Sequence, residues 1–309
     1  MQMKTIKAVV GIIHNTDAKI LIAKRQDHQF MGGYWELPGG KIEPNETQEA
    51  ALTRELREEL GIEVNQLSLY QTMVHQYEDR LVELYIYNID QYQHAPRGVE
   101  GQEIAWSTLA QLQQYPLLPT MRAFINTMTL PHKYWITPST EHQSKAWLSR
   151  FEQQLDADIE LIQLRSKSPL DSQFIADIYA KCRQKNVKLL LNIPNKTFAT
   201  AISDGWHLST AEMQALDARP CADEQLLGAS THNLSEALQA QEMGADFVVI
   251  SPVQATQTHP DTTPIGWDVA KEVVDRLNIP VYFLGGMTLA DLDRARALGA
   301  QGIAGGSAF

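Results

Sequence analysis

The sequence predicts two domains, an α+β domain over residues 1–130 and a parallel (β/α)8 barrel over residues 134–309. Two observations favour this division. At 309 residues the chain is long for one domain and comfortable for two. Apolar, β-branched runs surround one long amphipathic helix in the first part, whereas short apolar runs alternate with amphipathic segments from Tyr134 onwards.

The composition is that of a folded, acidic protein, with 44% apolar and 20% charged residues and a net charge of −11. Residues 1–130 hold 11 Lys and Arg against 16 Asp and Glu, and the remainder holds 15 against 21. Neither part is basic, which argues against tight binding to a nucleic acid polymer. Cys182 and Cys221 are too few and too far apart for a disulfide framework or a thiolate zinc site.

The N-terminus, "MQMKTIKAVVGIIHN", has only a short apolar run and no small-residue cleavage site, so it indicates a strand and not a signal peptide. No run approaches the roughly 20 apolar residues that a membrane span requires. We therefore expect a cytoplasmic protein with no membrane segment.

The first domain begins with two strands, "IKAVVGIIH" and "KILIAKR", which "NTDA" is expected to join as a hairpin turn. A short strand, "WELPGG", follows and ends in a Pro/Gly turn. A helix then runs from about Thr47, a suitable N-cap, to Gly61, a suitable helix stop. Its core side carries Leu52, Leu56 and Leu60. "LVELYIYNID" predicts another strand, and "STLAQLQQYPLLPTMRAFINTM" predicts two short helices.

Beyond a junction around Pro131, eight strand-like runs predict the barrel: "YWIT", "IELIQLR", "VKLLLNI", "GWHLS", "LLGAS", "FVVISP", "VYFLGG" and "GIAGG". Amphipathic segments such as "NLSEALQAQEMGA" lie between them and end in Gly-Ala helix stops. The final outer helix is absent from the pattern. We expect the N-terminal domain or a partner chain to cover that side. A second copy of the chain in that place would form a homodimer.

The helix at residues 47–61 gathers acidic residues. Glu55, Glu58 and Glu59 share one face, because side chains three and four residues apart are neighbours on a helix. Like charges repel at this spacing unless cations join them. Hard divalent cations bind oxygen ligands, bridge phosphates and lower the pKa of a bound water. The pattern therefore indicates metal-assisted phosphate chemistry.

The stretch "GGKIEPNETQEAALTRELREELGI" resembles the Nudix box, Gly-x5-Glu-x7-Arg-Glu-apolar-x-Glu-Glu-x-Gly-apolar, at every fixed position. The matching residues are Gly40, Glu46, Arg54, Glu55, Leu56, Glu58, Glu59, Gly61 and Ile62. The first 130 residues further resemble MutT-type Nudix hydrolases in "GIIHN", "ILIAKR", "WELPGGKIEPNET" and "VEGQEIAW". The resemblance implies an α/β/α fold with a mixed sheet between helices.

It also implies an activity, in which a water activated by Mg²⁺, or alternatively Mn²⁺, attacks the β-phosphorus of a nucleoside triphosphate such as 8-oxo-dGTP. The products would be a nucleoside monophosphate and pyrophosphate. The implied metal ligands are the Gly39 carbonyl, Glu58 and Glu59. Glu55 and Glu100 would each act as a ligand or as a base, and Glu103 is the alternative to Glu100. Arg54 would orient a carboxylate. The implied substrate contacts are Arg25 and Lys41 to phosphate or nucleotide, and Glu36, Leu37 and Pro38 along the base pocket.

One departure concerns the base. MutT enzymes that prefer oxidised guanine read the purine edge with an Asn near the end of the domain. Here "YPLLPTMRAF" places Pro119 or Thr120 at that position. Proline offers no side-chain hydrogen bond, and threonine offers one short hydroxyl. The sequence therefore predicts pyrophosphohydrolysis without predicting a preference for 8-oxoguanine.

The second domain resembles the thiamine-phosphate synthase and thiazole tautomerase superfamily in "IQLRSK", "LLLN", "DGWHLS", "LGASTHNLSEALQAQEMGADFVVISPV" and "FLGGMTLADLDRARALGAQGIAGGSAF". The glycines after the seventh strand and at the eighth would form a phosphate corner, to which Arg165 and Lys167 could add charge. The corner residues are Gly285, Gly286, Gly305, Gly306 and Ser307. His232 is a candidate acid or base.

The family's two metal-binding aspartates are not evident in this barrel. Ile193 follows the Asn of "LLLN", and "HLSTAEM" offers no Asp. His259 stands where the family has a phosphate-binding lysine. These departures predict a degenerate barrel that binds a ligand and is not a thiamine-phosphate synthase.

Three hypotheses follow. The first is a Mg²⁺-dependent Nudix pyrophosphohydrolase of nucleoside triphosphates, concerned with removing damaged nucleotides. The second keeps this chemistry but takes a thiamine-pathway diphosphate as substrate. The third makes the barrel a regulatory module or scaffold.

Overall fold

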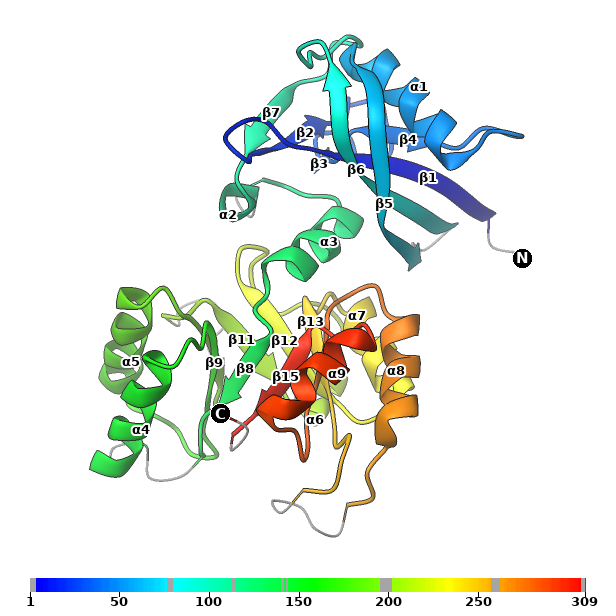
Figure 1. The fold of residues 1–309 in the computed structure, drawn as a ribbon. Coiled ribbons are helices and arrows are strands. Elements are labelled where there is room, and N and C mark those ends of the chain that lie inside the picture. Colours follow the sequence, from blue (N-terminus) through cyan, green and yellow to red (C-terminus); the bar gives the residue numbers. More distant parts are fainter. Residues whose placement is uncertain are drawn as a thin grey trace. The chain divides into compact units, whose positions relative to one another are not determined.

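The computed structural model describes residues 4–76, 80–112, 115–139, 142, 144–194, 202–256, 262–306 and 309. His259 and Ser307, named above for the barrel, lie outside these residues. The chain divides into two units, Met1–Thr129 and Leu130–Phe309, next to the predicted junction around Pro131 (Figure 1). Within the described part, no helix combines the length and the apolar character that crossing a bilayer requires.

The N-terminal unit contains a mixed sheet, as predicted, with the strand order β4-β1-β6-β5. Its strands are β4 (Gly39–Lys41), β1 (Lys4–Ile13), β6 (Arg80–Gln93) and β5 (Glu63–Gln76). Strand β1 runs parallel to β6 and antiparallel to β4, and β5 runs antiparallel to β6. A second, antiparallel sheet has the order β3-β2-β7, formed by β3 (Trp35–Glu36), β2 (Ile20–Lys24) and β7 (Ile104–Ser107).

Helix α1 (Gln48–Leu60) has the predicted bounds. The Thr47 hydroxyl accepts a hydrogen bond from Ala50 N, and Gly61 ends the helix in the left-handed conformation at φ 68°. The leucine stripe packs on the mixed sheet, because leucines at i, i+4 and i+8 share one face. This core contains Leu52, Leu56, Leu60, Val9, Ile13 and Ile62.

The other face of the sheet is covered as well. Val10 and Ile12 alternate with Val9 and Ile13 along β1, so they point to the opposite face, where they are also buried. The two predicted helices after β7 are α2 (Leu109–Leu112) and α3 (Pro119–Thr129). In α3, the Phe124 ring packs edge to face against the Tyr70 ring of β5, with ring centroids 5.8 Å apart.

Three details of the predicted strands are wrong. Strands β1 and β2 do not form a hairpin: the chain turns at Asn15, a single bridge joins His14 to Ile20, and the strands then enter different sheets. "WELPGG" is two strands, because the chain changes sheet at Pro38, whose carbonyl accepts from Gly11 N. Strand β5 was not predicted at all.

Eight parallel strands close into a barrel, as predicted, in the order β10-β11-β12-β13-β14-β15-β8-β9. The strands are β8 (Lys133–Ile136), β9 (Leu161–Arg165), β10 (Lys188–Asn192), β11 (Gly205–Leu208), β12 (Leu226–Thr231), β13 (Phe247–Ile250), β14 (Val281–Phe283) and β15 (Gly302–Gly305). The helices between them in the described residues are α4 (Lys145–Leu155), α5 (Ser172–Gln184), α6 (Thr210–Gln214), α7 (Leu234–Glu242), α8 (Gly266–Arg276), η1 (Leu289–Asp291) and α9 (Leu292–Ala297). Figure 1 shows these helices outside the strands.

Alternation along the strands gives the barrel two cores. One apolar cluster fills its interior and includes Leu161, Leu190, Phe247 and Tyr282. The other, larger cluster lies between strands and helices and includes Leu164, Leu191 and Val248. Each unit therefore has a core of its own.

We predict that Leu56→Ala lowers the unfolding free energy of the N-terminal unit by about 2–5 kcal/mol, because the side chain is fully buried between α1 and the sheet. Urea unfolding followed by circular dichroism measures the change. Leu69→Ala is the matched control, since Leu69 is 54% exposed, and should change the unfolding free energy by less than about 0.5 kcal/mol. Equal effects of the two changes would contradict the predicted packing.

Candidate active site

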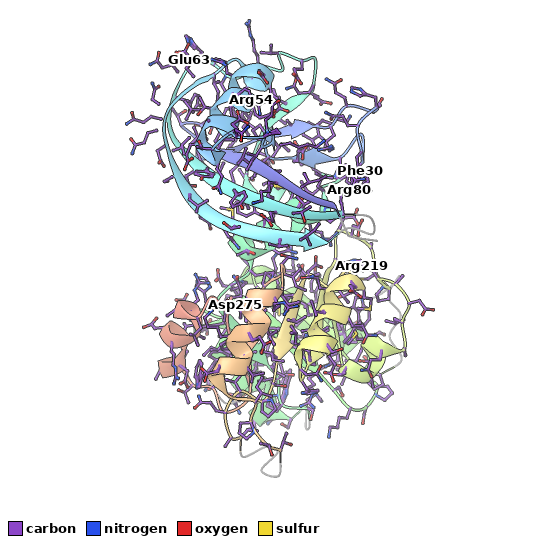
Figure 2. All side chains as sticks on the ribbon, turned by 90° about the vertical axis from the view of Figure 1, so that its right-hand side faces the viewer. Phe30, Arg54, Glu63, Arg80, Arg219 and Asp275 are labelled. Carbon is purple, nitrogen blue, oxygen red and sulfur yellow. The ribbon has the colours of Figure 1, made fainter. Side chains whose placement is uncertain are left out.

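Arg54 is the centre of the acidic cluster on α1. Its guanidinium donates to both carboxylate oxygens of Glu46, at 2.9 and 3.0 Å. It also donates to Glu55 at 2.9 Å, to Glu58 at 3.2 Å and to the Lys41 carbonyl at 3.2 Å. Figure 2 shows Arg54 within the N-terminal unit. The hydrogen bonds that Arg54 donates to Glu46 and Glu55 raise the pKa of Arg54. The same bonds to Glu46 lower the pKa of the Glu46 carboxyl group.

The two glycines before the helix allow a close approach of chains. A Cβ on Gly40 would collide with the Glu55 carboxyl group, and a Cβ on Gly39 would collide with the Val9 carbonyl oxygen. Gly39 also has φ 144°, which non-glycine residues rarely adopt. Burial raises the pKa of Glu55, and its bond to Arg54 opposes the shift.

Glu59 differs from the carboxylates that Arg54 holds. It accepts a hydrogen bond from Gly39 N at 3.1 Å, and it makes no ion pair with the described residues. Burial, with a smaller effect from the nearby charges of Glu36, Glu55 and Glu100, raises the pKa of Glu59 to about 8, although the hydrogen bond from Gly39 N opposes the shift. A partly buried carboxylate surrounded by other carboxylates is a candidate cation ligand.

Glu59 lies in a cleft that brings together most of the predicted substrate and metal residues. The cleft is lined by Ala23, Lys24, Arg25, Gln26, Gln29, Glu36, Leu37, Pro38, Gly39, Glu59, Glu100 and Gln102. Arg25 donates there to Glu36 and to the Phe30 carbonyl, so its guanidinium is already engaged. Burial raises the pKa of Glu36, which Arg25 opposes. Sequence reasoning missed Gln26, Gln29 and Gln102, because polar loop residues give no pattern.

Several predicted residues do not line this cleft. Glu103 lies 3.5 Å from Lys24 in an exposed ion pair and is absent from the lining, whereas Glu100 is present. The Lys41 side chain is exposed. Pro119 and Thr120 begin α3 directly after Leu118, whose N–H bonds to the Trp35 carbonyl.

The predicted barrel residues lie at the carboxyl ends of its strands. Arg165 ends β9, and its carbonyl accepts from His142 at 2.7 Å. Lys167 is exposed two residues later. His232 follows β12, where its Nδ1 lies 2.8 Å from the Ser251 carbonyl. That nitrogen must carry a proton, because a carbonyl oxygen only accepts hydrogen bonds.

The residues of the glycine corner differ in backbone conformation and contacts. Gly285 and Gly286 have φ 92° and 67°, and a Cβ on either would collide with the segment around Pro252. Gly305 ends β15, and the Gly306 carbonyl accepts from Arg150 at 2.6 Å.

The barrel interior also holds buried polar groups. His207 lies 3.1 Å from the Tyr134 hydroxyl and 2.8 Å from the Ser230 hydroxyl. Gln163 shares the inner face of β9 with Leu161 and Arg165. Its Oε1 is buried and has no hydrogen-bond partner among the described residues.

Comparison with known families agrees with both predicted domains. Residues 9–127 match the family described as "NUDIX domain", and residues 133–309 match the family described as "Thiamine monophosphate synthase". The chain is a Nudix domain fused to a thiamine monophosphate synthase family domain.

Individual relatives resemble one domain each. The Nudix domain is 38% identical over 110 residues to the 8-oxo-dGTP diphosphatase of Escherichia coli (strain K12), covering 36% of this chain and 85% of that protein. It is equally identical, 38% over 117 residues, to the CTP pyrophosphohydrolase of the same organism, covering 38% and 86%. The synthase family domain is 32% identical over 185 residues to the "Putative thiamine-phosphate synthase 2" of Aquifex aeolicus (strain VF5), covering 59% and 99%.

The donors around the Nudix cleft fit a divalent cation in kind and in charge. They are oxygens, which hard cations prefer, and the Glu59 carboxylate has no cationic partner among the described residues. As the side chains stand, however, no three His, Cys, Asp or Glu of the described residues converge into a metal-binding group. The assignment of individual ligands is therefore a proposal.

We predict that the metal-free protein loses stability as pH rises from about 5 to 8. The pKa of Glu59 is about 8 in the folded domain and 4.5 for an ordinary glutamate. The contribution of Glu59 to the unfolding free energy is therefore complete below pH 4.5 and is lost as the pH rises through 8. Glu36 and Glu55, with raised pKa values, act in the same direction. The melting temperature of the Nudix domain should fall by roughly 4–8 °C for each kcal/mol lost.

Mg²⁺ or Mn²⁺ should raise that melting temperature more at pH 8 than at pH 5, since a cation favours the charged carboxylates. Glu59→Gln should remove the largest part of the pH dependence. Glu63→Gln is the control, because Glu63 lies exposed at the edge of the same domain (Figure 2). A pH dependence that is unchanged in Glu59→Gln would contradict the assignment.

Proposed function

We propose that the Nudix domain is a Mg²⁺-dependent pyrophosphohydrolase of nucleoside triphosphates, of the 8-oxo-dGTP house-cleaning type. It releases a nucleoside monophosphate and pyrophosphate. The general class of the domain is hydrolase acting on phosphoric anhydrides. The finer parts of the proposal, the cation and the substrate, rest on the cleft and on the relatives' activities.

The observation that carries the proposal is the position of Glu59. Its carboxylate lies in the cleft against the Gly39 backbone, within electrostatic reach of Glu36, Glu55 and Glu100. Arg54 balances Glu46, Glu55 and Glu58 from outside the cleft lining, but Glu59 and Glu100 make no ion pair with the described residues. When Glu59 is ionised, this excess of negative charge would repel a triphosphate unless a cation were bound.

The residues divide the work as follows. Glu58, Glu59 and the Gly39 carbonyl would hold the cation, with Glu55 and Glu100 as further ligands. A divalent cation bound there would neutralise phosphate oxygens and lower the pKa of a water. Arg54 fixes the Glu55 carboxylate through a hydrogen bond. Glu55 or Glu100 would accept the proton of the attacking water, and burial, which raises the pKa of Glu55, makes its carboxylate a stronger base than an ordinary glutamate.

The base of the substrate is less constrained than the triphosphate. Neither Pro119 nor Thr120 lines the cleft, and neither carries an amide like the purine-reading Asn. The 8-oxo-dGTP and CTP hydrolases are equally similar to this domain. 8-oxo-dGTP and CTP are therefore the first two substrates to compare.

We further propose that the barrel binds a ligand but is not a thiamine-phosphate synthase. Ile193, at the place of the family's first metal-binding Asp, packs against the apolar cluster outside the barrel. Glu212, the acidic residue after "HLS", accepts from Ser209 N and Ser209 Oγ at 2.8 Å in a capping box. Its carboxylate is thereby committed to the start of α6.

Ligand binding is supported by Gln163 Oε1 inside the barrel, which has no hydrogen-bond partner in the described part of the chain. A buried acceptor without a partner is costly, and a polar ligand would satisfy it. Arg165, Lys167, His232 and the glycine corner, at the same end of the barrel, would supply the contacts to an anionic group.

We predict that the full-length protein releases pyrophosphate from 8-oxo-dGTP, dGTP, dATP or CTP only when Mg²⁺ or Mn²⁺ is present. Glu59→Gln and Glu55→Gln should lower kcat by about 10²- to 10⁴-fold, because each removes a charge at the reacting phosphate. Glu63→Gln should stay within about twofold of the wild type. Release of phosphate from thiamine diphosphate or hydroxymethylpyrimidine diphosphate, with none from the nucleotides, would favour the second hypothesis.

Gly40→Ala should lower kcat by about 10²-fold, because the new methyl group displaces the Glu55 carboxylate and not the backbone. Steady-state kinetics measure this effect, and thermal melting checks that the domain still folds. Full activity in Gly40→Ala would show that the position of Glu55 does not matter for turnover.

For the barrel, no thiamine phosphate should form from hydroxymethylpyrimidine diphosphate and thiazole phosphate, as monitored by chromatography. Formation of thiamine phosphate that depends on a metal ion would overturn the proposal that the barrel is not a thiamine-phosphate synthase. A ligand-binding barrel should nevertheless show a shift in melting temperature with one of these phosphates, and Arg165→Ala should abolish the shift.

A further inference from the structure

The segment Arg97–Gln102 closes the carboxyl end of α1. The last carbonyls of a helix have no partner within the helix. Here Arg97 N donates to the Leu60 carbonyl at 3.1 Å, and Val99 N donates to the Glu59 carbonyl at 2.9 Å. The loop that carries Glu100 is therefore attached to the residue that carries the cleft carboxylate.

Gln102 ties these two carboxylate residues together. Its side-chain Nε2 donates to the Glu59 carbonyl at 2.9 Å, and its Oε1 accepts from Glu100 N at 3.0 Å. One amide group thus bridges the backbone of Glu59 and the backbone of Glu100. A shorter amide or an apolar side chain of the same length cannot do this.

Gln26 holds the other side of Glu100. Its Nε2 donates to the Glu100 carbonyl at 2.8 Å. Gln26 follows β2 and Gln102 precedes β7, and these strands pair directly, with Ala23 opposite Ile104. The two glutamines therefore lie just beyond neighbouring ends of two paired strands, which places both beside the loop.

The carboxylate of Glu100 has no other support. Its side chain is exposed and makes no hydrogen bond or ion pair with the described residues. The turn around it is tight: a Cβ on Gly98 would collide with the Gln102 carbonyl, and Gly101 has φ 84°. Its position in the cleft depends on how its own peptide groups are held.

We propose that Gln102 and Gln26 are positioning residues, which hold Glu100 by its N–H and its carbonyl and so fix its carboxylate in the cleft relative to Glu59. The inference rests on the proposed function, in which Glu100 is a ligand or a base. A reacting carboxylate is effective only when its position is fixed in advance. Both glutamines also line the cleft, and the proposed restraint acts through the backbone of Glu100.

The test compares single variants with a matched control. Gln102→Met keeps the length of the side chain but removes both bonds, and it should lower kcat about tenfold, as loss of a supporting contact typically does. KM should change by less than about twofold. Gln26→Met removes one exposed bond and should lower kcat by about threefold. Gln111→Met is the control: among the described residues, the Gln111 side chain bonds to Thr108 at the start of α2, and it is outside the cleft lining.

A double-mutant cycle separates positioning from a general structural effect. In the Glu100→Gln background, Gln102→Met should lower kcat by less than about twofold, because the group on which it acts is already neutral. Equal losses in the two backgrounds would overturn the proposal. So would activity of Gln102→Met equal to that of Gln111→Met.

Two measurements do not need turnover. Amide hydrogen exchange at Glu100 should be at least about tenfold faster in Gln102→Met than in the control, because the N–H has lost its acceptor. The affinity for Mn²⁺ without nucleotide, followed by electron paramagnetic resonance, should fall by about tenfold. Unchanged exchange and affinity would overturn the proposal. If the wild type cleaves no nucleoside triphosphate, the proposed function fails, and these two measurements still decide the positioning.

Discussion

The N-terminal domain depends on one guanidinium. A helix with Glu55, Glu58 and Glu59 on one face repels itself, and Arg54 offsets much of that repulsion from within the same helix. Because Arg54 also binds Glu46 and the Lys41 carbonyl, it joins the helix to the loop that precedes it. A lysine could not replace it, since a single ammonium lacks the planar fork that serves several acceptors at once.

Arg54 does not neutralise the whole cluster. Glu59 lies on the cleft side of the helix, where the Gly39 N–H is its hydrogen-bond donor. The domain thus separates its carboxylates into a group that is balanced inside the protein and a group that faces the cleft. The two groups of carboxylates lie close together, because Gly39 packs against Val9 and Gly40 packs against Glu55 without a Cβ between them. In the barrel, the Glu212 carboxylate has a different role, since it caps the start of α6.

Features that depend on neighbouring residues could be predicted from the sequence. Thr47 and Gly61 mark the ends of α1, and each barrel strand is a local apolar run. Strand β5 could not be predicted, because its side chains are largely polar or exposed, such as Leu69 and Val74, and pairing with β6 alone makes it a strand. The role of Gln26 was hidden for a similar reason: its partner, Glu100, lies 74 residues away along the chain.

The closure of the barrel has a consequence for biosynthesis. Strand β8 pairs with β15, so the first and the last strand of the barrel are neighbours, and the ring cannot close until residue 305 has left the ribosome. The strands of the N-terminal unit are complete by Ser107. Domains emerge and fold in order during translation. The Nudix domain can therefore reach its native state while the nascent barrel is still an open, incomplete sheet.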